Sequence, residues 1–345
     1  MVRPKRASVS WGVSLIRHRH LTPDIVTLDD VRAARIRLAP LLSTTPLRNY
    51  RELDAVVGHG VRVFVKHENF NPTGSFKVRN GLSFMTALPD EARARGVVAA
   101  TRGNHGLGVA YAGRAFGVRV TVCVPVGNNP DKNAGMRALG ARLVEEGRDY
   151  DESVQVAERI VREEGATLAH STNNRQVIAG AGTLSLEMFE QEPGLDALVI
   201  AVGGGSQAVG ALTVFGALRP EVKVYGVQAA GAAASHDAWH ARRPVQLERA
   251  DTFADGLATR SSYEMTLPAL LDGLAGFITV TDAEIAEAMR MLMRTTHTMV
   301  EPAGAAGLAG LVKLAPSLEG KRVGIVLSGA NVDSATLRRV LSGEL

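Results

Sequence analysis

One lysine stands where covalent chemistry could begin. Residues 71–77 read Asn-Pro-Thr-Gly-Ser-Phe-Lys, a turn-forming composition that ends on Lys77 at the expected start of a helix. The helix dipole and the exposed amides there disfavour a second positive charge, which helps to keep an amine neutral. A neutral amine can form an imine with an aldehyde. Considered alone, Lys77 would be a solvated lysine at a helix start, and only the other segments indicate a chemical role for it.

A second segment has the form of an anion site. Residues 101–106, Thr-Arg-Gly-Asn-His-Gly, follow an expected strand and open an expected helix. Backbone amides at a helix N-terminus can hold an anion such as a carboxylate. An ordinary helix-capping turn is the alternative interpretation.

Three consecutive glycines form a third segment. Residues 202–206 read Val-Gly-Gly-Gly-Ser between an expected strand and helix, and glycines allow the backbone to wrap closely around a phosphate. Gly203, Gly205 and Ala208 also fit the dinucleotide pattern G-x-G-x-x-A. The acidic residue that this pattern requires at the end of the next strand is replaced by Gln228. We therefore expect a phosphate site and not a dinucleotide site.

Hydroxyl and carboxyl groups occupy further loop positions. Ser328 follows the apolar run 323–327 at the C-terminal edge of an expected strand, where ligands gather in open α/β sheets. The segments 255–257, Asp-Gly-Leu, and 301–304, Glu-Pro-Ala-Gly, are loop signals that indicate little by themselves.

The elements that must position these segments alternate between short β-branched runs and longer amphipathic runs, a pattern typical of βαβ units and a mainly parallel sheet. No linker-like composition divides the chain, so a second domain would be inserted into the first. Asp282 has the position of a helix N-cap. Expected strands are 61–66, 96–100, 118–124, 197–202, 223–228 and 323–327, and expected helices are 107–116, 131–139, 150–164 and 283–296.

Composition places the chain among ordinary globular proteins. Its 345 residues are 46% hydrophobic and 21% charged, which is enough apolar content for two domains. Much of the net charge of +4 lies in a basic N-terminal tail, residues 1–24, and no apolar run is long enough to span a membrane. His18 and His20 lack partner ligands at a metal-binding spacing. The lone Cys123 lies in an apolar run, which predicts a buried strand thiol and a cytoplasmic protein.

In this order and spacing, the segments resemble the threonine/serine dehydratase family of fold-type-II pyridoxal 5'-phosphate (PLP) enzymes, which includes serine racemases. The resemblance runs from about Asp24 to Leu345 and opens with Thr-Pro-Leu at 45–47. It implies an α/β fold like that of the tryptophan synthase β subunit, with the cofactor in a cleft between two open domains. Residues 25–95 and 170–345 would form the large PLP-binding domain and residues 96–169 a smaller mobile domain, with no C-terminal regulatory domain.

The resemblance also implies a role for each site residue. Lys77 would carry PLP as a Schiff base and act as the catalytic base. The cofactor-binding residues would be Phe76 and Gly256 on the ring faces, Asn104 at the ring hydroxyl, Glu301 near the ring, Ser328 at the pyridine nitrogen, and Gly203, Gly204, Gly205 and Ser206 at the phosphate. The substrate-binding residues would be Thr101, Arg102, Gly103 and His105.

The implied activity is that of a lyase, a dehydratase or ammonia-lyase that acts on a hydroxy amino acid. Lys77 would remove the α-proton as general base, and the cofactor would act as electron sink. A serine at the pyridine nitrogen favours prompt loss of the β-hydroxyl over transamination. The products would be a 2-oxo acid and ammonia.

Departures from the family lie on the substrate side. Arg102 stands where a racemase of the family has its second acid/base, and a guanidinium cannot do that work. Arg102 could point to solvent, form a structural ion pair, or bind a second substrate carboxylate. The substrate could therefore be threonine, serine, 3-hydroxyaspartate, a phenylserine-like compound or a hydroxyectoine-derived intermediate. Residues 228–234 contain no carboxylate where some relatives bind a cation, so we expect no tight metal site.

Two other functions remain open from sequence. A β-replacing PLP synthase would share the fold, and a PLP-binding protein without turnover would share the cofactor, although the latter needs neither Lys77 nor Ser328. The family also implies a homodimer or tetramer, and nothing in the sequence indicates a nucleic-acid or membrane partner.

Overall fold

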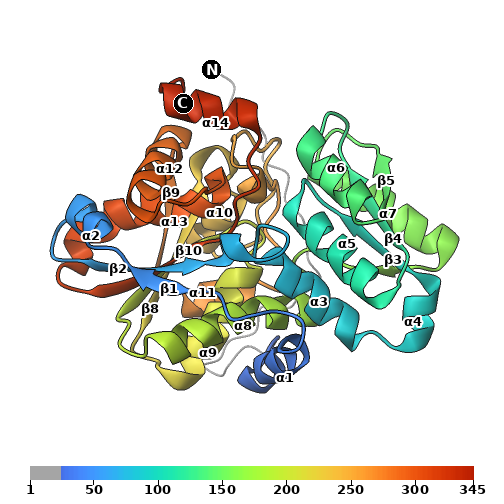
Figure 1. Cartoon of the computed structure of the whole chain (residues 1–345), viewed down its shortest axis with the longest axis horizontal. Helices are drawn as coiled ribbons and strands as arrows, with labels where there is room; N and C mark the ends of the chain where they lie inside the picture. Colours follow the sequence, from blue (N-terminus) through green and yellow to red (C-terminus); the bar gives the residue numbers. More distant parts are fainter. Residues whose placement is uncertain (1–24) are drawn as a thin grey trace.

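The computed structural model describes residues 25–345 and contains two β-sheets (Figure 1). The larger sheet has the order β1-β2-β10-β7-β8-β9, in which β1 pairs antiparallel with β2 and every other pair is parallel. Its strands are β1 (Leu47–Asn49), β2 (Arg62–His67), β10 (Arg322–Leu327), β7 (Ala197–Ala201), β8 (Lys223–Ala229) and β9 (Gly276–Val280). The smaller, parallel sheet is β5 (Arg142–Glu145), β4 (Val120–Val124), β3 (Val97–Ala100) and β6 (Thr167–Leu168).

Helices cover both sheets. They are α1 (Leu28–Leu38), α2 (Arg51–Val57), α3 (Lys77–Ala87), α4 (Asp90–Arg95), α5 (Asn104–Phe116), α6 (Pro130–Ala138), α7 (Tyr150–Glu164), α8 (Arg175–Gln191), α9 (Ser206–Leu218), α10 (Ala234–Ala241), α11 (Leu267–Gly273), α12 (Asp282–Thr296), α13 (Pro302–Leu314) and α14 (Ser334–Ser342). In Figure 1, α4 to α7 surround the smaller sheet on one side of the molecule. No helix within residues 25–345 is long and apolar enough to cross a bilayer.

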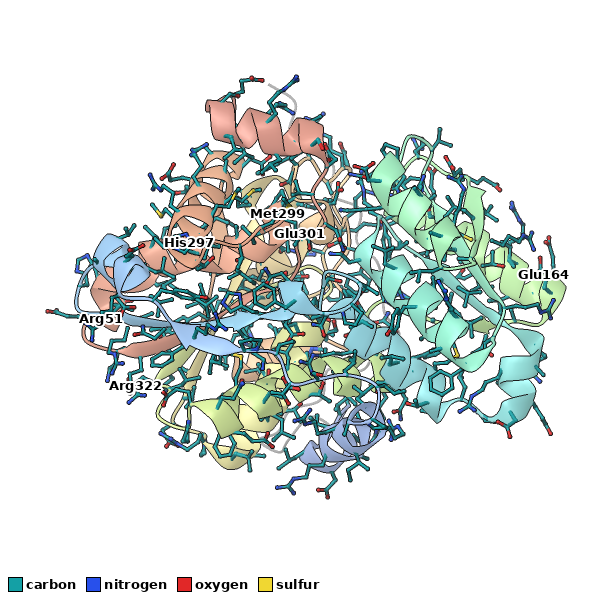
Figure 2. The ribbon with its side chains drawn as sticks, viewed as in Figure 1. Arg51, Glu164, His297, Met299, Glu301 and Arg322 are labelled. Atoms are coloured by element: carbon teal, nitrogen blue, oxygen red, sulfur yellow. The ribbon has the colours of Figure 1, made fainter. Side chains whose placement is uncertain are left out.

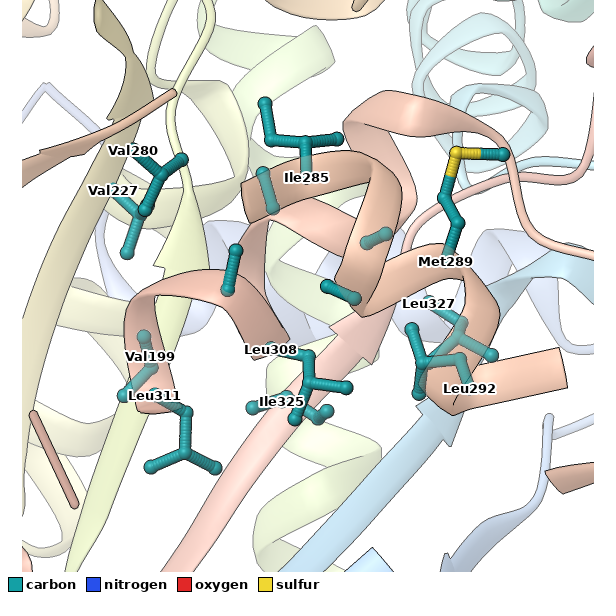
Figure 3. Close-up of a cluster of buried hydrophobic side chains, with 14 of the residues drawn as sticks. Val199, Val227, Val280, Ile285, Met289, Leu292, Leu308, Leu311, Ile325 and Leu327 are labelled. Carbon is teal, nitrogen blue, oxygen red and sulfur yellow. The ribbon is translucent and has the colours of Figure 1, made fainter. Parts of the chain in front are cut away.

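The period-two pattern of the strands explains the layers. In β7, Val199 packs with α12 and α13, whereas Leu198 and Ile200 pack with α8 and α9 on the opposite face. Figure 3 shows the first of these clusters, with side chains from β7, β8, β9, β10, α12 and α13. Because a central parallel strand is covered on both faces, all its residues can be apolar, and this made the strand recognisable in the sequence.

The predicted strands and helices are confirmed, with differences of a few residues at their ends. One detail is wrong: Thr281, not Asp282, caps α12, because Thr281 Oγ1 accepts from Glu284 N at 3.2 Å and Glu284 accepts from Thr281 N at 2.7 Å. Asp282 instead accepts from Thr252 Oγ1 at 2.5 Å. The strands β1, β5, β6 and β9 were not predicted. They are short or only partly buried, and their apolar pattern is correspondingly weak.

The smaller sheet arises from a stretch of chain between β2 and β7, so it is inserted within the larger sheet's sequence. Helix α3 belongs to its packing as well, since Val78 and Leu82 share a cluster with Val97 and Val122. Domain limits at residues 96 and 169 stay a prediction.

Cys123 is buried in β4, as expected, and burial raises the pKa of its thiol to about 11. The basic tail, 1–24, with His18 and His20, lies outside the described residues.

Candidate active site

The carboxyl ends of the parallel strands bring distant segments together. Ser328 follows β10 directly, and its carbonyl accepts a hydrogen bond from Phe76 N at 3.0 Å. Ala330 N likewise donates to the carbonyl of Gly74 at 2.8 Å. The turn before Lys77 is therefore fixed to the end of β10, at the edge where ligands bind in open α/β sheets.

One pocket at this edge collects every site residue that the sequence predicted. It is lined by Phe76, Lys77, Thr101, Arg102, Gly103, Asn104, His105, Gly203, Gly204, Gly205, Ser206, Gly256, Glu301 and Ser328. Residues that the sequence did not single out complete the lining, among them Lys132, Tyr150, Gln207, Thr259 and Tyr263. Asp255 was noted only as part of a loop.

Lys77 is the first residue of α3, and its Nζ lies 4.9 Å from the centre of the Phe76 ring. Burial lowers the pKa of Lys77 from 10.5 to about 8, with the nearby Glu301 carboxylate opposing the shift. At neutral pH, an appreciable fraction of this amine is therefore uncharged and nucleophilic.

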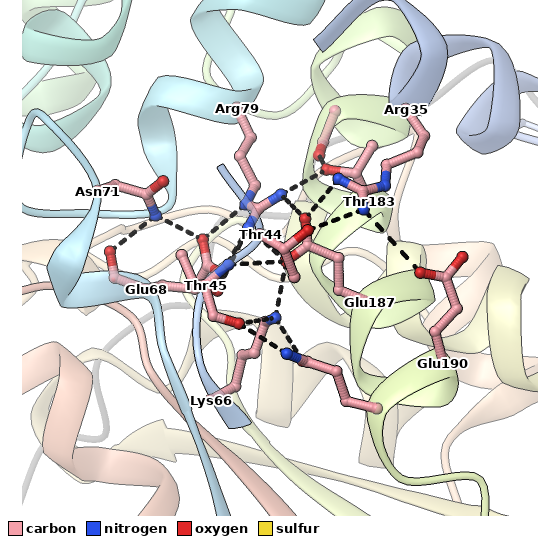
Figure 4. Close-up of polar contacts among 12 residues, drawn as sticks. Arg35, Thr44, Thr45, Lys66, Glu68, Asn71, Arg79, Thr183, Glu187 and Glu190 are labelled. Atoms are coloured by element: carbon pink, nitrogen blue, oxygen red, sulfur yellow. Dashed lines mark hydrogen bonds and ion pairs between the residues drawn. The ribbon is translucent and has the colours of Figure 1, made fainter. Parts of the chain in front are cut away.

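A buried ionic network behind the pocket fixes α3 (Figure 4). Arg79 of α3 pairs with Glu68 at 2.7 Å and with Glu187 of α8 at 2.8 Å, and Lys66 of β2 pairs with Glu187 at 2.7 Å. Burial raises the pKa of Glu187, but Arg79 and Lys66 outweigh it and hold that pKa below its usual value. Arg35 of α1 also pairs with Glu187 at 2.9 Å and with Glu190 at 4.0 Å, so three cations face three carboxylates. This balanced cluster orients the helix that carries Lys77.

The glycine segment has the form of a phosphate cradle. A Cβ on Gly203 would lie 2.5 Å from the Gly256 carbonyl oxygen, and one on Gly204 would lie 1.9 Å from Thr172 Oγ1. Gly205 caps α9 with φ +98°, a conformation that favours glycine. Thr266 Oγ1 donates to the Gly204 carbonyl at 2.7 Å, so this carbonyl is engaged by the protein. The first backbone amides of α9 have no carbonyl partner within the helix, so they can donate hydrogen bonds to an anion.

The N-terminus of α5 has the form of a second anion site. Thr101 Oγ1 accepts from Gly103 N at 2.8 Å, which fixes the turn. His105 Nε2 lies 2.7 Å from the Ala169 carbonyl oxygen, and burial, reinforced by the Lys77 charge, lowers the His105 pKa to about 3. The neutral ring must therefore donate through Nε2, which leaves Nδ1 an acceptor. Any bond from His105 to a carboxylate must come from its backbone amide.

Asn104 is held by two partners at the junction of the sheets. Its Nδ2 donates to Glu301 Oε1 at 2.5 Å, and its Oδ1 accepts from Asn331 Nδ2 at 2.8 Å. Figure 2 shows Glu301 in this central position. Burial raises the pKa of Glu301, and Lys132 and the Asn104 hydrogen bond oppose that shift. The second amide hydrogen of Asn104 remains for a ligand.

Lys132 of α6 was missed because nothing around it in the sequence indicates a ligand. It is buried, and its Nζ lies 3.1 Å from Asp255 and 4.0 Å from Glu301. A Cβ on Gly103 would lie 2.3 Å from the Lys132 side chain, so the close contact requires glycine. Lys132 thus links the smaller sheet's helices to the loop that carries Gly256.

The donor set suits a cofactor with an aldehyde, a phosphate and an aromatic ring. A partly neutral lysine, a cradle of glycines and the hydroxyl of Ser328 line the same pocket. Residues 38–329 match the family model described as pyridoxal-phosphate dependent enzyme. This chain belongs to that family. The finding confirms the predicted cofactor and fold-type-II class.

Relatives of known activity cover most of the chain. It is 34% identical over 318 residues to L-threonine ammonia-lyase of Thermotoga maritima, covering 92% of this chain and 79% of that protein. It is 34% identical to L-threo-3-hydroxyaspartate ammonia-lyase of Pseudomonas sp, and the match covers 91% of this chain and 98% of that protein. The structure of maize serine racemase superposes with a TM-score of 0.87 at 30% identity, and the match covers 93% of this chain and 98% of the racemase chain. These similarities confirm the resemblance to threonine ammonia-lyases.

Proposed function

We propose that this PLP-dependent enzyme removes water from a β-hydroxy amino acid and releases a 2-oxo acid and ammonia. The observation that carries the proposal is the placement of Lys77, whose pKa is lowered to about 8, beside the α5 N-terminus and the glycine cradle in one pocket. The relatives named as ammonia-lyases support it.

Residues of the pocket would hold the cofactor in defined places. Lys77 would bind it covalently, and the amides of Gly203 to Ser206 would hold its phosphate. Phe76 and Gly256 would cover the ring faces, Asn104 would meet the ring hydroxyl, and Ser328 would face the ring nitrogen. When bound, PLP supplies an electron sink for the α-carbon.

The chain's own groups then perform the proton transfers. Amides at the start of α5 orient the substrate carboxylate. Lys77 Nζ would take the α-proton, because a pKa of about 8 suits a general base near neutral pH. The resulting ammonium is a donor for the departing β-hydroxyl.

Elimination is favoured over racemisation by the residue beside the α5 N-terminus. Racemisation requires a second acid/base group on the other face of the α-carbon. Arg102 lines the pocket where such a group would stand, and a guanidinium stays protonated throughout the working pH range.

The test is a substrate panel with the purified holoenzyme. L-threonine, L-serine, both 3-hydroxyaspartate diastereomers and phenylserine are incubated with enzyme, and 2-oxo acid, ammonia and the opposite enantiomer are measured. We expect 2-oxo acid and ammonia in equal amounts, abolished in Lys77→Ala and retained in Lys223→Ala, which removes an exposed lysine. Enantiomer without 2-oxo acid would contradict elimination, and trapping of the intermediate only by an added thiol would indicate a synthase.

Assembly and compartment are part of the proposal. We propose a homodimer or tetramer in the cytoplasm, with residues 96–169 as the smaller domain that closes over substrate. Phe70 and Met299 support an interface, since they are 49% and 46% exposed and Asn69 Nδ2 donates to the Met299 carbonyl. Light scattering of the wild type and of Phe70→Asp tests the assembly, and a monomeric wild type would refute it.

A further inference from the structure

Arg102 is a cation at the mouth of the active site. It lines both the pocket around Lys77 and an adjoining outer cavity of about 650 Å³. Its Nε is buried and has no hydrogen-bond partner among residues 25–345. Within residues 25–345 the Arg102 guanidinium forms no ion pair. Arg102 is half-buried, and a charged donor nitrogen that is buried without a partner is costly, so the site is arranged for an anion that binds from outside.

Three of the four acids that line the outer cavity with Arg102 are engaged elsewhere. Asp255 binds Lys132 Nζ at 3.1 Å, and Glu301 accepts from Asn104. In the outer cavity, Asp333 caps α14 through Thr336 N at 2.7 Å, and Asp131 is exposed to solvent. None of these carboxylates pairs with Arg102 in the part of the chain that the structure describes.

The helix arrangement adds to the attraction for negative charge. Helix α5 begins just after Arg102, and the first residues of α6, α13 and α14 line the outer cavity. The positive ends of these helix dipoles favour a bound anion. In the proposed function, the α5 amides bind the α-carboxylate that every α-amino acid carries. The Arg102 guanidinium is then left to bind a second carboxylate.

We propose that Arg102 binds a second carboxylate on the β-carbon of the substrate, so that the preferred substrate is a β-hydroxy amino dicarboxylic acid. This inference rests on the proposed dehydratase function. The planar guanidinium matches the two oxygens of a carboxylate and is always charged. The β-hydroxyl leaves as water and one water re-enters on hydrolysis, so the net products are a 2-oxo dicarboxylic acid and ammonia.

The test compares specificity ratios in the holoenzyme. For each variant, kcat/KM is measured with the two 3-hydroxyaspartate diastereomers and with L-serine and L-threonine. In Arg102→Ala we expect the dicarboxylate-to-monocarboxylate ratio of kcat/KM to fall about 10- to 100-fold, the range for loss of a charge-assisted hydrogen bond. Arg102→Lys should retain part of the preference. The matched control Arg148→Ala removes an arginine whose side chain is 83% exposed and should keep the wild-type ratio.

A binding measurement complements turnover. Succinate should compete with substrate more strongly than butyrate in the wild type, and Arg102→Ala should abolish that difference. If the variant loses activity equally toward all substrates, Arg102 binds the α-carboxylate or is structural, and the inference is wrong. If the wild type prefers serine or threonine, the inference fails while the dehydratase function stands. If no hydroxy amino acid yields a 2-oxo acid, the proposed function itself fails.

Discussion

The lowered pKa of Lys77 sets the pH at which the enzyme can take up its cofactor. Lys77 attacks an aldehyde only as a neutral amine, and its pKa of about 8 compares with 10.5 for a free lysine. At pH 7 the neutral fraction is then about 9%, against about 0.03% for the free amine, a gain of about 300-fold. The cause is burial in the pocket, with Glu301 acting in the opposite direction.

The assay is the rate of cofactor attachment to the cofactor-free protein. Stopped-flow absorbance is recorded from about pH 6 to about pH 10, with Nα-acetyl-lysine as the control for ionisation of the cofactor itself. We expect the attachment rate of the protein to rise about tenfold per pH unit below pH 8 and to level off above it, whereas the rate of the control amine keeps rising to about pH 10. The ratio of the two rates should therefore be constant below pH 8 and fall above it. A ratio that stays constant up to pH 10 would refute the reasoning.

A variant separates the two causes of the shift. Glu301→Gln removes the charge that raises the Lys77 pKa, so the plateau should begin at lower pH. The control Glu264→Gln changes an exposed carboxylate and should leave the profile in place.

The lowered pKa of Lys77 also makes the free energy of unfolding of the cofactor-free protein depend on pH. Between pH 8 and 10.5 the unfolded chain binds more protons at this lysine than the folded chain does, so stability should rise with pH there.

Further predictions concern the cradle, the ionic network and a cap. Gly204→Ala should weaken PLP binding at least tenfold in absorbance titrations, because its Cβ would lie 1.9 Å from Thr172 Oγ1, whereas Gly216→Ala, with no atom within 4 Å, should bind normally. Glu187→Ala should lower the free energy of unfolding by about 3–5 kcal/mol in denaturant titrations, since it removes the carboxylate that pairs with buried Lys66 and one of the two that pair with Arg79. Unchanged unfolding would count against the network. Thr281→Ala should cost about 1 kcal/mol of stability without affecting kcat, because it removes only the α12 cap.

Local sequence determined the positions of the chemistry. A turn that ends on a lysine, a glycine run between strand and helix, and a hydroxyl after an apolar run are short-range patterns, and each lies where the sequence placed it. The buried strands were equally readable, because a strand covered on both faces must be apolar throughout. Short strands such as β1 and β6, with only 3 and 2 residues, carry too little pattern to be recognised.

Tertiary structure alone decided which of these groups meet and in what state. Lys132 reaches Asp255 across 123 positions of sequence, and no local pattern marks either as part of a pair. The pKa of Lys77, the tautomer of His105 and the unpaired state of Arg102 depend on burial and on neighbours from other elements. Sequence fixes residue type and local conformation, whereas desolvation and charge pairing act through space. The chemistry could therefore be located from the sequence, but its protonation and specificity followed only from the folded chain.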